Sequence, residues 1–294
     1  MITDMELSSI IKYIRNAASL SQESFADKIG VTRLTVTRWE NDVSVPNKIA
    51  QRKIYDVAKE HNAEFFDLII SDMPVHGTEN EKIILYHASD RGITGPIGPK
   101  SRDNCDFGRG FYMGTHAEQP LTLIFSSDKD DTEKAVMYTV ELDLKGLNVL
   151  YVPPDIDWAL LVAYFRNKMK RYGKTALYER YSRMLAGYDV VAGKIADDRI
   201  FTALDLFFRN LITDKGVIEC LSALPLGDQY VALTEKACRQ IRILEQRSFS
   251  EIERLCINDA SERNRGSGVA AAEEVRKGHR REGRYFDEIM EERG

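Results

Sequence analysis

The order of hydrophobic and polar residues in the first quarter of the chain follows the period of amphipathic α-helices. Gly30 comes directly after the second apolar stripe, at the position expected for a helix C-cap, and Thr32 is placed to cap the next helix. Residues 1–72 are therefore predicted to form an all-helical unit. A segment with proline and glycine between periodic patterns follows, and we interpret it as a linker over residues 73–80.

Beyond the linker the pattern changes to short apolar runs bounded by glycine and proline, with helical patterns between them. Such runs are typical of buried β-strands. The predicted strands cover residues 83–86, 136–142, 149–152, 190–192 and 230–233, and the predicted helices cover 158–170 and 200–211. Residues 81–245 are accordingly predicted to form a mixed α+β domain.

The last part of the chain, residues 246–294, is dominated by charged side chains. From Glu245 onward the chain holds 10 basic and 12 acidic residues. Apolar stripes at helical spacing lie near residues 249–255 and 285–290, and a glycine-containing break lies at 265–268. This composition favours a helical tail that is solvated or partly disordered, and a partner-binding arm is the alternative.

The composition agrees with two soluble domains and indicates the cellular compartment in which the protein is expected to act. A length of 294 residues corresponds to two domains of roughly 150 residues each, and 43% of the residues are hydrophobic. No run approaches the ~18 apolar residues of a membrane span, and the start of the chain lacks the basic and apolar segments of a secretory signal. The four cysteines have no zinc-ligand spacing. We expect a cytoplasmic protein with reduced thiols, no metal site and no membrane partner.

The segment from Ser21 to Asn41 resembles the helix-turn-helix of Xre/Cro-repressor-type regulators. Ala26, Gly30 and Val36 supply the small contact residue, the turn and the apolar packing that suit two helices at a steep angle. The resemblance implies that the second helix of the motif lies in the major groove of DNA. The implied base contacts are Arg33, Leu34, Thr37 and Arg38, and the implied phosphate contacts are Gln22 and Thr35.

Charge along the chain limits DNA binding to one face of the N-terminal unit. The whole chain carries a net charge of −5, whereas residues 28–53 carry +4. The complete unit, residues 1–72, sums to −2, so a basic surface must be one-sided. DNA is therefore the predicted partner, and a helix-turn-helix that serves only dimerisation is the alternative. The family analogy also implies a homodimer.

Three segments of the second domain combine glycine, aromatic and polar residues in a pattern that suits a ligand pocket. The first is an apolar strand that ends in His87-Ala-Ser89. The second is the turn Asp106-Phe-Gly-Arg-Gly-Phe-Tyr112, whose glycines let the backbone approach a ligand closely. The third is a glycine turn followed by a strand that opens with Asp228-Gln229.

Together these segments resemble the ADP-ribosyltransferase superfamily, in the branch of diphtheria toxin and the poly(ADP-ribose) polymerases. That branch has a histidine at a strand end, a tyrosine after a glycine turn and a glutamate at the start of a later strand. The matching positions here are His87, Tyr112 and Gln229. A nearer resemblance, over about residues 82–245, is to bacterial ADP-ribosyltransferase-like proteins, which share the motif Val191-Ala-Gly-Lys-Ile-Ala-Asp-Asp198. The resemblance implies an α+β ADP-ribosyltransferase-like fold.

The same resemblance implies that the pocket binds NAD, with His87, Tyr112 and Gln229 as catalytic residues. His87 would hydrogen-bond a ribose hydroxyl, and backbone groups of Ala88 would hold the nicotinamide carboxamide. Tyr112 would stack on the nicotinamide ring with support from Phe111. The implied cofactor-binding residues are His87, Ala88, Ser89, Arg102, Gly110, Phe111 and Tyr112.

Gln229 departs from the polymerase pattern, because it stands where that pattern has a glutamate. A glutamine can position a hydroxyl group, but it cannot act as a general base. Single transfer is therefore expected rather than synthesis of a long polymer. Asp197 and Asp198 are candidates for activating the acceptor, although aspartates at a helix start are equally typical of N-caps.

These features predict an NAD-dependent mono-ADP-ribosyltransferase joined to a DNA-binding helix-turn-helix, as in a bacterial or phage toxin or defence effector. Its acceptor would be a protein or a nucleic acid, and an antitoxin is a candidate partner. One alternative is a transcriptional regulator whose inactive ADP-ribosyltransferase-like domain senses NAD or ADP-ribose, and the glutamine at position 229 supports it. Another alternative is an NAD glycohydrolase, in which water is the acceptor.

Overall fold

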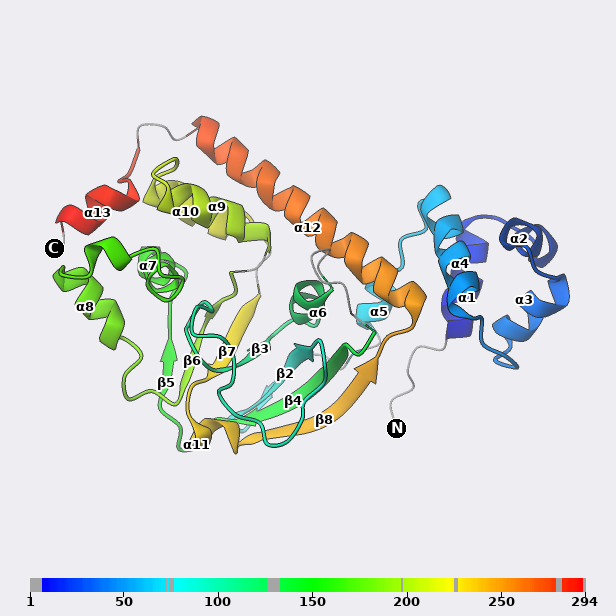
Figure 1. The fold of residues 1–294 in the computed structure, drawn as a ribbon, viewed down its shortest axis with the longest axis horizontal. Helices are drawn as coiled ribbons and strands as arrows, with labels where there is room; N and C mark the ends of the chain where they lie inside the picture. The colour runs from blue at the N-terminus through cyan, green and yellow to red at the C-terminus, as the bar shows by residue number, and fades with distance from the viewer. Residues whose placement is uncertain are drawn as a thin grey trace.

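A computed structural model describes residues 7–71, 73, 77–125, 133–196, 198–224, 227–278 and 282–292. The N-terminal part of the protein is helical, as predicted. Its helices are α1 (Leu7–Ala17), α2 (Gln22–Ile29), α3 (Arg33–Glu40), α4 (Lys48–Glu60) and α5 (Phe66–Ser71). Helices α1 to α4 gather at one end of the molecule (Figure 1).

The predicted caps Gly30 and Thr32, together with Ser21, fix the geometry of the helix-turn-helix. The Ser21 side chain caps α2 by accepting a hydrogen bond from the Ser24 backbone N–H, and Thr32 caps α3 in the same way through the Thr35 N–H. Gly30 ends α2 with a φ of 75°, a left-handed conformation that glycine adopts without a steric penalty. The turn between α2 and α3 is therefore encoded locally, by three residues.

The second part of the protein is built on a mixed sheet of eight strands within the described residues. The strands are β1 (Thr78–Glu79), β2 (Lys82–Ser89), β3 (Phe111–Gly114), β4 (Val136–Asp143), β5 (Val149–Tyr151), β6 (Val190–Lys194), β7 (Asp228–Ala232) and β8 (Ile241–Ser248). Their order is β5-β6-β7-β3-β2-β4-β8, with β1 paired to β2. Only the β5–β6 pair is parallel among these pairings.

Helices lie between these strands in the chain and continue after β8 to the end of the described residues. They are α6 (Glu118–Ile124), α7 (Ile156–Phe165), the 3-10 helix η1 (Lys170–Tyr172), α8 (Ala176–Arg183), α9 (Asp198–Phe208), α10 (Asp214–Ala223), α11 (Glu235–Cys238), α12 (Glu251–Gly278) and α13 (Phe286–Glu292). The five predicted strands and the helix predicted over 200–211 are confirmed within three residues at each end, whereas the helix predicted over 158–170 ends earlier, because α7 stops at Phe165. The predicted α+β class is thus confirmed as a mixed α/β domain.

The tail is largely helical, as predicted, but the prediction that it is solvated or partly disordered is wrong for its described residues. Ile252 and Ile257 of α12 are fully buried, as are Phe286 and Ile289 of α13. The expected glycine break at residues 265–268 is also absent, because α12 continues through it. Glycine weakens a helix by about 1 kcal/mol, and buried contacts on both sides of the break outweigh that cost.

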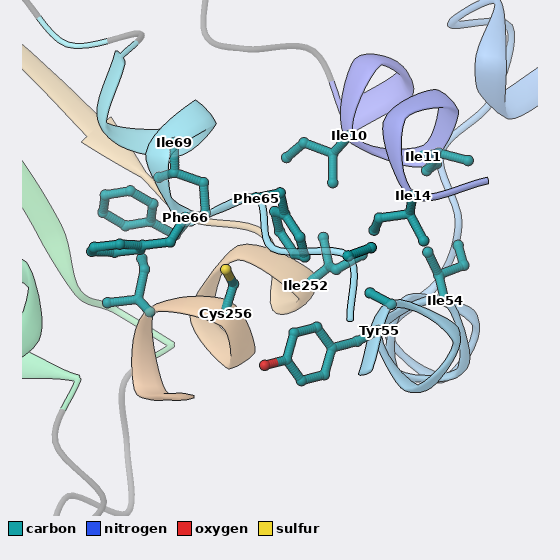
Figure 2. Close-up of a cluster of buried hydrophobic side chains, with 14 of the residues drawn as sticks. Ile10, Ile11, Ile14, Ile54, Tyr55, Phe65, Phe66, Ile69, Ile252 and Cys256 are labelled. Carbon is teal, nitrogen blue, oxygen red and sulfur yellow. The ribbon is translucent and has the colours of Figure 1, made fainter. Parts of the chain in front are cut away.

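The long helix α12 joins the two parts of the molecule. Figure 1 shows it running from the N-terminal helices across the sheet domain towards α9 and α10. Its first turns share one hydrophobic core with α1, α4 and α5, in which Ile252 and Cys256 meet Tyr55 and Phe65 (Figure 2). Further along, Ala272 and Val275 enter the core around α7 and α9. One continuous helix therefore packs against both parts.

Candidate active site and DNA-facing helix

A cavity of about 980 Å³ lies beside β2 and β3 and is also bordered by the loop of residues 90–110, by α6 and by the start of α9. Its size is ordinary for a site that holds a small organic ligand. The cavity brings together every residue for which the sequence implied cofactor contact or catalysis, from the strands β2, β3 and β7 and from the loop before β3. These residues are His87, Ala88, Ser89, Arg102, Gly110, Phe111, Tyr112 and Gln229.

Strand pairing explains why residues so far apart in sequence meet here. β3 pairs with β2 on one side and with β7 on the other, and Gly114 is the register partner of both Tyr86 and Gln229. His87, Tyr112 and Gln229 therefore lie on three adjacent strands.

His87 is held by its ring nitrogen Nδ1, which lies 2.7 Å from the backbone oxygen of Tyr112. A carbonyl oxygen can only accept, so Nδ1 carries the proton and Nε2 of a neutral ring is left as an acceptor. Burial lowers the pKa of His87 below its ordinary value of 6.5, which favours the neutral ring at pH 7. Phe111 stacks on His87 with ring centroids 4.2 Å apart, rather than supporting Tyr112 as expected.

Tyr112 closes the turn that precedes its own strand. Its hydroxyl donates to the backbone oxygen of Gly108 at 2.7 Å and accepts from the N–H of Phe107 at 3.0 Å. Burial and the charge of Asp106 raise the pKa of Tyr112 well above its usual range, so the hydroxyl stays protonated. The Tyr112 ring is thus a fixed, uncharged wall of the cavity.

Glycine is required at two positions of this turn, for a different structural reason at each. Gly108 has a φ of 74°, in the left-handed region. A Cβ at Gly110 would come within 2.3 Å of the Val231 side chain on β7. The first glycine permits the turn, and the second permits the close approach of the turn to the strand that carries Gln229.

Gln229 is almost completely buried, with 2% of its surface exposed, and its side chain is engaged by two acceptors. Its Nε2 donates to Oδ2 of Asp106 and to the backbone oxygen of Lys194, both at 3.1 Å. Asp106 in turn forms an ion pair with Arg166, whose Nη2 lies 2.6 Å from Oδ1. The Ala196 N–H also donates to Oδ2 of Asp106.

Asp106 and Arg166 are site residues that sequence reasoning missed as functional candidates. Asp106 was visible as the first residue of the glycine turn, and Arg166 sits just after a helix with no motif around it. Both line the cavity. By contrast, the acceptor-side prediction at Asp197 lies outside the described residues, as does the side chain of Asp198, the residue that opens α9.

The residues predicted to contact DNA fall into two groups, one exposed to solvent and one half-buried. Arg33, Leu34 and Arg38 are exposed on α3, and 59% of the Leu34 surface is accessible. Thr35 and Thr37 are half-buried, and the Thr35 hydroxyl lies 2.8 Å from that of Thr32. These DNA contacts stay predictions.

Gln22 is engaged inside the motif. Its Nε2 donates to Glu40 at 2.7 Å and its Oε1 accepts from Thr37 at 3.0 Å, while Arg15 forms an ion pair with the same buried Glu40. Gln22 therefore ties α2 to α3, in addition to any phosphate contact it makes.

Comparison with family models places both parts of the chain. Residues 83–243, more than half of the chain, match the model described as Protein of unknown function (DUF3990). The chain belongs to the DUF3990 family. Residues 11–54 match the model described as Helix-turn-helix. This match confirms the helix-turn-helix prediction at the N-terminus and supports a DNA-binding, regulator-like role.

No curated protein and no solved structure matches the chain. Within the described residues no helix combines the length and the apolar character of a membrane span.

Proposed function

We propose that the protein is a DNA-binding regulator whose DUF3990 domain binds NAD or ADP-ribose, and that the bound ligand changes its affinity for DNA. The observation that carries this proposal is the convergence of His87, Tyr112 and Gln229 on one cavity, in a chain whose helix-turn-helix packs on a shared helix. The resemblance to ADP-ribosyltransferases supports NAD or ADP-ribose as the ligand, and the packing of α12 on both parts of the chain supports an effect on DNA binding.

The residues of the cavity suit a ribose-containing ligand. Nε2 of a neutral His87 and Oε1 of Gln229 are both acceptors, which match the hydroxyl donors of ribose. Phe111 and Tyr112 offer ring surface for a planar group, and Arg102 adds a positive charge for a phosphate. The site thereby contains partners for the ribose hydroxyls, a planar ring and a phosphate of NAD or ADP-ribose.

A chain of contacts leads from the cavity to the DNA-facing unit. Pro120, Leu123 and Ile124 of α6 line the cavity. The Thr122 backbone oxygen of the same helix accepts a hydrogen bond from Ser261 of α12 at 3.0 Å.

At the other end of this path α12 is bonded to α4. Asp259 accepts from the Tyr55 hydroxyl at 2.5 Å and pairs with Lys59 at 3.0 Å, while Glu251 pairs with Arg52 at 2.7 Å. A ligand that shifts α6 has a direct mechanical route to α4. Such a shift can change DNA affinity only by as much as the ligand's preference for one arrangement over the other.

Calorimetric titration with NAD and with ADP-ribose tests the ligand. We expect binding by the wild type and at least tenfold weaker binding by His87→Ala, because the variant lacks the Nε2 acceptor. His116→Ala is the matched control, since His116 is exposed in the same domain and does not line the cavity. Absence of any binding by the wild type would remove the ligand-sensing proposal.

Anisotropy titration of labelled DNA, selected by the protein from a random-sequence pool, tests the regulatory part. The affinity is measured with and without saturating ADP-ribose, for the wild type and for His87→Ala. We expect the ligand to change the DNA affinity of the wild type only. Equal DNA affinities with and without a bound ligand would show that the cavity and the helix-turn-helix act independently.

A second candidate function, mono-ADP-ribosyl transfer, is favoured by the arrangement of His87, Tyr112 and Gln229 on neighbouring strands. Cleavage of the nicotinamide–ribose bond passes through an oxocarbenium-like state, for which placement and exclusion of water matter more than a strong nucleophile. Gln229 can orient a ribose hydroxyl there, but another group or the acceptor itself must supply the base.

Incubation of the purified protein with labelled NAD and a cell lysate distinguishes the candidates, with Tyr112→Ala beside it. Label transferred only by the wild type would establish a transferase and would identify a protein or nucleic-acid acceptor. Released nicotinamide without transferred label would establish a glycohydrolase. Ligand binding without either reaction is the result that the regulator predicts.

A further inference from the structure

The amide of Gln229 can adopt only one orientation in its surroundings. Its two neighbours at 3.1 Å are a carboxylate oxygen of Asp106 and the backbone oxygen of Lys194, and neither can donate. Both hydrogens of Nε2 are therefore used by these acceptors. Oε1, which has no hydrogen-bond partner among the described residues, is left on a side chain that lines the cavity.

Asp106 is itself saturated and cannot serve as a base. Oδ1 accepts from Nε and Nη2 of Arg166, and Oδ2 accepts from the Ala196 N–H and from Gln229. A carboxylate has about four acceptor positions, and all of them are occupied. Its role is to hold its neighbours in place.

We propose that Asp106 is a positioning residue that fixes the Gln229 carboxamide with Oε1 as the acceptor for a ligand hydroxyl. Because this contact places the side chain of residue 229 next to the Asp106 carboxylate, that side chain must be uncharged. The hydroxyl class of ligand rests on the proposed function, in which it belongs to the ribose of NAD or ADP-ribose. Gln229 thus selects a hydroxyl donor and disfavours a group that only accepts, such as a phosphate oxygen.

A glutamate at position 229 would place a second carboxylate about 3 Å from Asp106, as the present hydrogen bond requires. Two such groups cannot both ionise easily, so the pair would hold a proton at mildly acidic pH. A protonated glutamate can donate to Asp106 in place of Nε2. Gln229→Glu therefore predicts a defect at alkaline pH that is relieved by acid, which a purely steric role would not produce.

The test compares the full-length wild type with Gln229→Glu, Asp106→Asn and the double variant at about pH 8 and about pH 5. Gln246→Glu is the matched control, because it makes the same charge change on an exposed side chain of β8 that does not line the cavity. Two quantities are measured: the thermal unfolding midpoint without ligand, and the ADP-ribose affinity by calorimetry. Each variant is expressed relative to the wild type at the same pH, which removes the titration of His87 from the comparison.

We expect Gln229→Glu to lower the unfolding midpoint at pH 8 and to bind ADP-ribose at least tenfold more weakly there, with both differences smaller at pH 5. The amide that Asp106→Asn introduces can donate to a glutamate at position 229. The double variant should therefore bind more tightly than Gln229→Glu at pH 8 and show less dependence on pH. Gln229→Met, which has no amide and no charge, should fold and still lose affinity.

Three results would overturn the proposal. They are an unfolding midpoint of Gln229→Glu that matches the control at both pH values, a defect that does not change with pH, and unchanged affinity in Gln229→Met. If the wild type binds no ADP-ribose, the proposed ligand is wrong, and the unfolding midpoints alone then decide the role of Asp106. The failure of the ligand and the failure of the positioning contact are in this way separate outcomes.

Discussion

The Tyr112 hydroxyl shows how much one buried polar group can organise. It makes two hydrogen bonds to the turn before β3, and residues of that turn line the cavity. Tyr112→Phe removes both bonds and leaves the Phe107 N–H without its partner. We expect a loss of about 1–3 kcal/mol in the free energy of unfolding, measured by urea denaturation.

The matched control for this change is Tyr151→Phe, because 61% of the Tyr151 surface is exposed. That control should change stability by less than about 0.5 kcal/mol. Equal effects of the two substitutions would mean that the Tyr112 hydroxyl contributes nothing to the turn.

His87 gives the molecule a defined dependence on pH. Burial lowers its pKa in the folded protein below the ordinary 6.5, so between the two values the unfolded chain binds more protons. Stability should therefore fall as pH decreases through 6.5 and level off below the folded-state pKa, by at most about 1.4 kcal/mol per pH unit.

Urea denaturation across this pH range checks the prediction by comparing the wild type with His87→Gln. The free energy of unfolding should decrease with falling pH more steeply in the wild type than in His87→Gln, because glutamine does not titrate. His116→Gln, an exposed position, should keep the slope of the wild type. A slope that survives in His87→Gln would assign it to another group.

Individual site residues differed in how far the sequence revealed them. His87, Tyr112 and Gln229 belong to segments with glycine turns and strand patterns, and all three line the cavity. Arg166 could not be found this way, since its meaning comes from Asp106, which lies 60 residues earlier in the chain. Pairing of distant charged side chains leaves no local pattern in the sequence.

At the scale of elements, β8 and α12 show where the pattern of apolar residues fails to predict the structure. β8 is an edge strand with mostly exposed side chains, so it has no apolar alternation to recognise. α12 has charged residues along much of its length. It is ordered because it packs against two hydrophobic cores, which its own sequence does not reveal. The buried strands β2 and β4, by contrast, were predicted because burial imposes an apolar run.

The contribution of α12 is testable at Ile252, which is fully buried against the N-terminal helices (Figure 2). Ile252→Ala leaves a cavity there, and we expect it to lower the free energy of unfolding by about 2–5 kcal/mol. Val269→Ala on the same helix is the control, because 46% of its surface is exposed. If both variants unfold at the same urea concentration, the packing of α12 on these helices does not stabilise the protein.

At the scale of the whole molecule, the net charge of −5 is unfavourable for binding DNA, so we expect DNA to be bound through one face only. Arg33 and Arg38 are exposed on that face. Replacing both with glutamine should weaken binding to selected DNA by about tenfold or more. Fluorescence anisotropy at fixed salt measures the effect.

The control for overall charge is Arg183→Gln combined with Arg239→Gln, two exposed arginines of the sheet domain. This variant has the same net charge as the α3 variant. Equal weakening by both pairs would show that DNA responds to total charge and not to the helix-turn-helix surface.

The core that α12 shares with α1, α4 and α5 also has a consequence for folding during synthesis. A ribosome makes the chain from its N-terminus, and domains generally begin to fold as they emerge. The helix-turn-helix is complete by residue 54, yet Ile252, Cys256 and Ile257, which cover its inner side, are made about 200 residues later. Until these residues have been made and α12 has folded, the nascent protein exposes that apolar surface to water.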